Sequence, residues 1–88
     1  MKGETLLGFE KAHDGVHKYI AIVRNDETDR IRKIKFGDVQ YQHYFDKIGM
    51  YPHLNHLDPK RRDAYRNRHQ HDKLDEFSAG YFSWNYLW

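Results

Sequence analysis

The sequence predicts an α+β fold, in which a small antiparallel sheet of about three strands precedes a basic helix and a short aromatic helix. Three observations predict it: apolar and polar residues alternate before residue 38, Asp58-Pro59 opens a basic run, and most aromatic residues lie after residue 40. A chain of 88 residues is sized for one domain with a thin core. We expect a strand meander over 1–38, an irregular connector over 39–57 and a helical part over 58–88.

The meander is expected to contain three strands. These are residues 5–9, 16–24 and 30–36. Turn formers at 13–15 and 25–29 separate them. The run from Tyr19 to Val23 is apolar throughout, which is typical of a central strand buried on both faces. Because no fourth strand is visible, later residues must cover one face of the sheet.

The connector over 39–57 contains helix and strand breakers at Gly49, Pro52 and Asn55. A connection this long inside a small domain is expected to pack through its aromatic residues. After it, Asp58 and Pro59 have the residue types of a helix N-cap and first helical position. We expect this basic helix to run to about His71 or Leu74.

The last segment is predicted to be a helix over 79–88, capped by Ser78. At helical spacing the residues of one stripe are Phe77, Tyr81, Trp84 and Trp88. A strand is the competing interpretation, because aromatic and non-aromatic residues alternate from Phe82 to the end. The capping serine favours the helix.

Composition argues against several functional classes. Cysteine is absent, which excludes disulfides and thiolate chemistry. The net charge of +2 is smaller than expected for a protein that coats nucleic acid. We see neither a signal peptide nor an apolar run of membrane-spanning length, so we expect no membrane partner.

Catalysis and cofactor binding are not expected either. The sequence has no glycine-rich phosphate loop, nucleophile elbow or paired-carboxylate motif, and a domain this small has little room for a large pocket. Four of the seven histidines suggest a zinc site: His53, His56, His69 and His71. An all-histidine structural site is uncommon, and the last two point in different directions on a helix. We therefore predict no metal and no cofactor.

The arginines and aromatic residues of the second half are the candidate partner-binding residues. They are Arg61, Arg62, Tyr65, Arg66, Arg68, His69, Tyr81, Phe82, Trp84, Tyr86 and Trp88. Alternative roles remain open. Tyr81 and Trp84 are the residues most expected to pack in the core, whereas a chain-terminal Trp88 is expected to be exposed as an anchor. The arginines are equally suited to phosphates of nucleic acid.

The order of several short motifs resembles an uncharacterised family of short proteins encoded by large double-stranded DNA viruses of algae and amoebae. The motifs are Lys35-Phe36-Gly37, tyrosines 41 and 44, His56, Asp58, Arg61-Arg62, Tyr65, Arg68-His69, Ala79-Gly80, Ser83 and Leu87-Trp88. The resemblance covers roughly residues 30–88 and implies a viral setting without assigning a reaction.

The resulting hypothesis is a small structural or interaction protein, a minor virion component that binds larger capsid proteins and becomes part of an assembly. It would be located in the virion, or otherwise be soluble in the host cytoplasm or nucleus. The alternative is a nucleic-acid-binding accessory protein that uses the basic helix.

Overall fold

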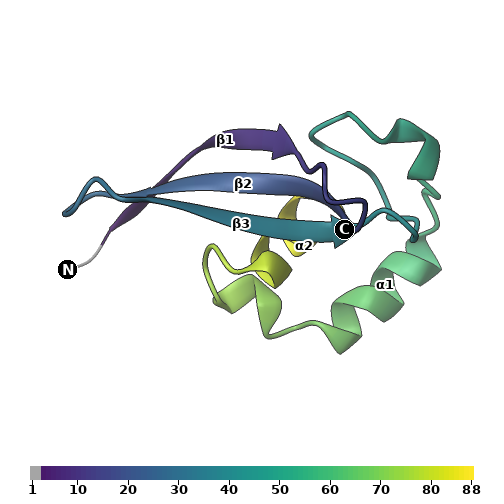
Figure 1. Ribbon diagram of the computed structural model, residues 1–88. Helices are drawn as coiled ribbons and strands as arrows, with labels where there is room; N and C mark the ends of the chain where they lie inside the picture. Colours follow the sequence, from purple (N-terminus) through teal and green to yellow (C-terminus); the bar gives the residue numbers. More distant parts are fainter. Residues whose placement is uncertain (1–2) are drawn as a thin grey trace.

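The computed structural model describes residues 3–88 and confirms the predicted α+β order: a three-stranded antiparallel sheet followed by two helices (Figure 1). The strands are β1 (Glu4–Lys11), β2 (His17–Asn25) and β3 (Ile31–Asp38), and the helices are α1 (Pro59–Arg68) and α2 (Ala79–Tyr86). Two short 3-10 helices, η1 (Pro52–Leu54) and η2 (Asp72–Leu74), lie in the segments before α1 and before α2. Helix α2 lies behind the sheet in Figure 1, and α1 lies beyond one end of it.

The sheet has the order β1-β2-β3, so β2 is the central strand, as the sequence predicts. Tyr19 pairs with Phe36 and Ala21 with Ile34 across the β2–β3 ladder. On the other side, a register shift between Leu6 and Gly8 leaves one extra residue in β1, which is a β-bulge.

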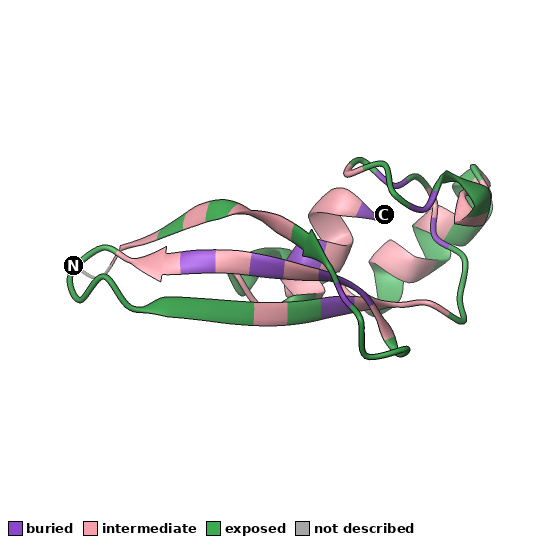
Figure 2. Ribbon diagram, turned by 45° about the horizontal axis from the view of Figure 1, so that its top comes forward, coloured by how far each residue is buried: buried purple, intermediate pink, exposed green. Residues whose placement is uncertain are grey.

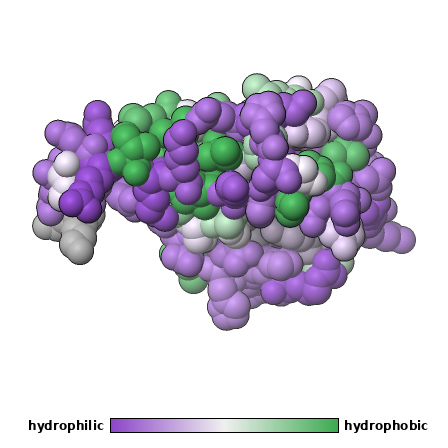
Figure 3. All heavy atoms as spheres, viewed as in Figure 1, coloured by the Kyte–Doolittle hydropathy of each residue, from purple (hydrophilic) through white to green (hydrophobic). Residues whose placement is uncertain are grey.

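Only one face of β2 is fully buried. Tyr19, Ala21 and Val23 are inaccessible to solvent, whereas the alternate residues Ile20 and Ile22 are partly exposed (Figure 2). The expectation of burial on both faces is therefore wrong, because α2 covers one face and nothing in the described part of the chain forms a second layer on the other. Figure 3 shows this uncovered face, where apolar side chains lie among hydrophilic ones.

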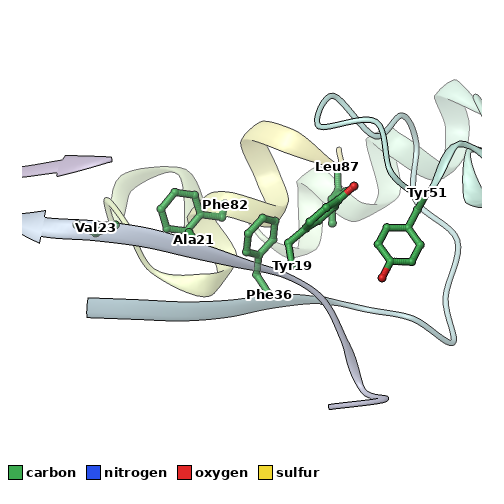
Figure 4. Close-up of a cluster of buried hydrophobic side chains, with 7 residues drawn as sticks. All are labelled: Tyr19, Ala21, Val23, Phe36, Tyr51, Phe82 and Leu87. Atoms are coloured by element: carbon green, nitrogen blue, oxygen red, sulfur yellow. The ribbon is translucent and has the colours of Figure 1, made fainter. Parts of the chain in front are cut away.

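The core is built on stacked aromatic rings between the sheet and α2. Phe82 stacks on Phe36 with ring centroids 5.4 Å apart and on Phe77 at 5.6 Å, while Phe9 meets it edge-on at 5.9 Å. Figure 4 shows Phe82 and Phe36 side by side, with Tyr19 next along the sheet. The fully buried residues of α2 and its end are Phe82 and Leu87, which lie outside the predicted stripe. Of the stripe, Phe77, Tyr81 and Trp88 pack against the core while partly exposed, and Trp84 does not.

The connector over 39–57 is irregular apart from η1, as predicted, but a carboxylate organises it. Asp46 is buried, and its Oδ1 accepts hydrogen bonds from the amides of Ile48 and Gly49 at 2.9 and 3.0 Å. Its Oδ2 accepts from the Tyr19 hydroxyl and from the Tyr51 amide at 2.9 Å. Burial alone raises the pKa of Asp46, but these hydrogen bonds outweigh burial and hold the pKa below its ordinary value.

Aromatic packing of the connector is limited. Tyr51 is buried and meets Tyr19 edge-on at 5.3 Å, whereas Tyr41 and Phe45 are exposed. The expectation that this segment packs through its aromatic residues therefore holds for Tyr51 and fails for those two. Backbone polar groups explain the difference, because an irregular buried segment must find hydrogen-bond partners for them first.

The basic helix is shorter than predicted. Asp58 caps it through a hydrogen bond from the Lys60 amide at 3.0 Å, as expected, but α1 ends at Arg68. His69 leaves the helical conformation, and its Nδ1 lies 3.0 Å from Asp72 Oδ2. The chain turns here into η2.

Helix α2 confirms the predicted helix and its cap, since the Ser78 hydroxyl accepts from the Tyr81 amide at 3.1 Å. It starts close against η2: a Cβ at Gly80 would overlap the Asp72 carboxylate. Neither α1 nor α2, nor either short helix within residues 3–88, is long and apolar enough to cross a membrane.

We predict that Asp46→Asn destabilises the protein by about 3 kcal/mol, because it removes the charged acceptor of a buried hydrogen-bond network. The depressed pKa of Asp46 means that its stabilisation is present above the ordinary carboxyl value and is lost as the pH falls through the folded-state value. Urea unfolding should therefore show that the free energy of unfolding of the wild type is lower at pH 3 than at pH 7. For Asp46→Asn this decrease should be smaller.

The matched control is Asp63→Asn, at an exposed position of α1. An Asp46→Asn variant as stable as this control at pH 7 would contradict the proposed role of the carboxylate.

Candidate functional site

An open groove of about 470 Å³ lies where the end of the sheet, the start of the connector, α1 and the end of α2 meet. Its walls include Lys18, Tyr41, Arg61, Tyr65, Arg68 and Trp88. The expectation that the domain has little room for such a pocket is wrong. The groove exists because α1 does not pack on the sheet but lies beyond its end (Figure 1).

Helix α1 divides its arginines between two directions. Arg61, Tyr65 and Arg68 line the groove, and their spacing of four and three places them on one helix face. Arg62 and Arg66, four residues apart, lie on the neighbouring face and contact the end of the chain. A single basic run in the sequence therefore serves two purposes.

Arg62 and Arg66 bind within the molecule. Arg62 Nε and Arg66 Nη2 donate to the Trp88 carbonyl oxygen at 3.0 and 3.1 Å. The Arg62 guanidinium lies 4.8 Å from the Tyr44 ring centroid, and that of Arg66 lies 5.0 Å from the Trp84 ring. These two arginines are thus occupied by the fold, which corrects the expectation that all four meet a partner.

Trp88 is likewise held inside the fold. Its ring is stacked on Tyr65, with centroids 4.2 Å apart and planes at 4°, and Tyr65 is stacked on His69 on its other side at 4.2 Å. His56 lies 5.2 Å from the Trp88 ring. The expectation of an exposed terminal anchor is therefore wrong. Burial raises the pKa of Tyr65 to about 12, so its hydroxyl stays protonated in the stack.

Lys18 is the least expected member of the groove. The residue is 2% exposed, and its ammonium donates to the Tyr41 carbonyl oxygen at 2.8 Å. An ammonium has three donors, and within residues 3–88 this is its one hydrogen bond. Burial lowers the pKa of Lys18 to about 8, against the opposing effect of the Asp38 and Asp46 carboxylates.

Gly37 allows Lys18 to lie there. Its φ of +74° is in the left-handed region that favours glycine. A Cβ at this position would lie 3.1 Å from Lys18 Cβ and 3.0 Å from Leu87 Cδ1. The end of β3 therefore has space for the lysine stem and the end of α2 at once.

The groove carries a local excess of positive charge. Lys18, Arg61 and Arg68 contribute three cations, and Asp38 is the one carboxylate in the lining. Arg61 Nη1 donates to Gln42 Oε1 at 2.8 Å, which leaves its other donors free of protein partners in the described chain. Arg68 makes no ion pair or side-chain hydrogen bond with residues 3–88. The arrangement is suited to binding an anion.

The remaining predicted residues do not join this site. Phe82 is fully buried and belongs to the core, so it is not available to a partner. Tyr81 and Tyr86 pack against the same core. Trp84 lies under two cations, since Lys73 Nζ is 5.7 Å from its ring in addition to Arg66. The aromatic residues of α2 thus mainly hold the fold together.

The histidines are not gathered into a metal site. Within residues 3–88, no three histidine, aspartate or glutamate side chains come together as ligands, so His53, His56, His69 and His71 do not converge. Of these, His69 lines the groove and bonds Asp72.

Lys18, Asp38, Tyr41 and Gln42 are groove residues that the sequence does not predict for a partner site. The one available signal is a lysine directly before the apolar run of β2.

Comparison of the chain with protein-family models, curated proteins and solved structures finds no match. The chemistry of the groove therefore carries the functional inference.

We predict that Arg62→Ala and Arg66→Ala each destabilise the protein by about 1–2 kcal/mol, because each leaves the Trp88 carbonyl oxygen with one donor fewer and removes a cation from an aromatic face. In a Trp84→Phe background, where Trp88 is the one tryptophan, its fluorescence should shift to the red. Arg30→Ala, at an exposed position in the loop before β3, is the control. An unchanged spectrum in both variants would show that these arginines do not hold Trp88.

We predict that Lys18→Met stabilises the protein by about 1–2 kcal/mol at pH 7, because it removes a buried charge that no carboxylate of residues 3–88 pairs with directly. The folded-state pKa of about 8 lies below the ordinary 10.5. The loss of folding free energy caused by the buried Lys18 charge is thus fully present below pH 8. It decreases as the pH rises to 10.5. Urea unfolding should show that the stability difference between Lys18→Met and the wild type is smaller at pH 10 than at pH 7. Lys47→Met, at an exposed site, is the control, and a destabilised Lys18→Met would contradict the argument.

Proposed function

We propose that this chain is a non-catalytic interaction protein that holds an acidic segment of a neighbouring protein in the groove beside α1. The observation that carries the proposal is that Lys18, Arg61 and Arg68 line one groove in which Asp38 is the single carboxylate of the lining. Guanidinium groups on a groove wall pair with carboxylates or phosphates through parallel hydrogen bonds. Among residues 3–88, none of these three cations is within ion-pair distance of a carboxylate.

The aromatic side chains support the proposal, but in a different role from the exposed anchors that the sequence suggests. Trp88 and Tyr65 form a rigid wall rather than projecting anchors. Tyr41 is 65% exposed and lines the same groove, so it offers a partner an accessible ring. The partner is thus recognised by cations in front of a pre-formed aromatic wall, which lowers the ordering cost of binding.

The proposed setting is a virus particle, in which this protein would tie larger neighbours together as a minor component. The resemblance described above suggests that setting, and several of its motif residues meet in the groove: Gly37, Tyr41, Arg61, Tyr65, Arg68, His69, Ser83, Leu87 and Trp88. Mass spectrometry of purified particles checks it directly, since absence of the protein would contradict a virion role.

Nucleic-acid binding is the second candidate, and one observation favours it. Lys60, Arg61 and Arg68 are exposed cations on α1, where they are accessible to a phosphate backbone. Opposing this, Asp58 and Asp63 lie within the same short segment. We regard a continuous polyanion as the weaker partner.

We predict that the purified protein binds a fluorescein-labelled hexaglutamate peptide, and that Arg61→Ala/Arg68→Ala weakens this binding at least about tenfold, since a contact to a charged group contributes 1.5–3 kcal/mol. Fluorescence anisotropy at several salt concentrations, with 12-nucleotide single-stranded DNA and RNA in parallel, measures it. Arg30→Ala should bind like the wild type.

Two outcomes would count against the proposal. Equal peptide binding by the wild type and the double variant would show that the groove is not the site. Tighter binding of an oligonucleotide, with log K falling against log salt with a slope of about −3 or steeper, would favour the nucleic-acid alternative.

A further inference from the structure

The charge of the groove defines the anion it suits best. Three cations, Lys18, Arg61 and Arg68, lie with one carboxylate, Asp38, which leaves an excess of +2. A carboxylate would neutralise half of that excess, whereas a phosphate monoester carries close to −2 at neutral pH. The charge balance therefore favours a dianion.

We propose that the groove is a phosphate-monoester site, which takes a phosphorylated side chain of the neighbouring protein between Lys18, Arg61 and Arg68. The inference rests on the proposed function and specifies the chemistry of its partner.

The donor set fits this ligand. Arg68 has its guanidinium free of ion pairs within residues 3–88, and the planar fork of arginine matches two phosphate oxygens at once. Lys18 supplies a buried ammonium with two donors that the described chain does not use. A phosphate monoester has three terminal oxygens for three cationic groups, and a carboxylate has two.

Burial makes Lys18 the informative residue. A lysine that is 2% exposed and has no ion pair in the described part of the chain costs stability unless an anion neutralises it. Gly37 leaves room for its stem at a position where a Cβ would press against Lys18 and Leu87 at 3.0–3.1 Å. These two features have a common explanation if a ligand supplies the missing negative charge.

A nucleic-acid backbone satisfies the same groups less well. Each phosphodiester carries one negative charge, and an extended strand would pass the carboxylates on either side of the groove residues. These are Asp58 and Asp63 around the first part of α1 and Asp72 and Asp75 after its end. Lys18, Arg61 and Arg68 line one open groove, which suits a single dianion.

The proposal has a defined pH dependence. Lys18 is influenced by Asp38, Asp46 and His43, and shares the groove with Arg61, Arg68 and His69. The pKa of Lys18 in the free protein is about 8, and a phosphate monoester loses its second charge below about pH 6. Affinity should therefore be greatest between about pH 6 and 8 and decline on both sides.

The test compares three fluorescein-labelled pentapeptides, Gly-Ala-X-Ala-Gly, with phosphoserine, glutamate or serine at X. We expect the phosphoserine peptide to bind at least about tenfold more tightly than the glutamate peptide, and the serine peptide to show no binding. Inorganic phosphate should compete, while sodium chloride of equal ionic strength should not.

Variants locate the site. Lys18→Met and Arg68→Ala should each weaken phosphopeptide binding about tenfold or more, and Arg68→Lys should be intermediate, because it keeps the charge and loses the fork. Lys47→Met should bind like the wild type. Since Lys18→Met is expected to be folded, loss of binding there is not explained by unfolding, and circular dichroism verifies this.

Each alternative result overturns a distinct claim. Equal affinity for the phosphoserine and glutamate peptides, both sensitive to Arg68→Ala, would reject the phosphate site and leave the acidic-partner function standing. Binding of single-stranded DNA or RNA, with no binding of either peptide, would reject both the phosphate-monoester site and the acidic-partner function. It would favour a nucleic-acid-binding role. Absence of binding to peptides and oligonucleotides alike would reject the groove as a binding site.

Discussion

The buried carboxylate of Asp46 is the constraint on which the second half of the structure depends. Residues 39–57 have almost no regular structure, so their backbone groups require partners from outside a helix or sheet. The Asp46 side chain accepts three of these hydrogen bonds, from the amides of Ile48, Gly49 and Tyr51. It accepts a fourth from the Tyr19 hydroxyl, which joins the connector to the central strand. The connector is thereby fixed to the sheet, and its amides are held where the end of α2 needs them.

That need arises because the last carbonyls of a helix have no partner within it. The amides of Tyr44 and Phe45 donate to the Leu87 carbonyl oxygen, both at 3.1 Å, and the Lys47 amide donates to that of Tyr86 at 2.9 Å. Arg62 and Arg66 of α1 donate to the next carbonyl oxygen, that of Trp88. Their positive charge is also favourable near the C-terminus of α2. Arg62 and Arg66 point toward the end of the chain, and the neighbouring face of α1, with Arg61, Tyr65 and Arg68, lines the groove.

Local signals explain which parts of this arrangement can be predicted. The strands follow from alternation, and both helix starts follow from a capping residue, because each signal acts within a few residues. The face of α2 does not follow: aromatic residues surround this eight-residue helix, and its contact with Phe36 and Phe77 is what selects Phe82 for the core. The division of the arginines and the burial of Lys18 depend on contacts between distant segments, which periodicity does not encode.

Lys18 is the residue through which an anion in the groove would change the stability of the domain. A small core contributes little surplus stability, so an unneutralised ammonium is a substantial fraction of the total. An anion in the groove would raise the pKa of Lys18 toward its ordinary value and remove part of the burial cost. By mass action, any ligand that binds only the folded chain adds to the free energy of unfolding. For the proposed ligand this gain is larger in the wild type than in a chain without the lysine. Under the proposed function, the domain would therefore be most stable when its partner is bound.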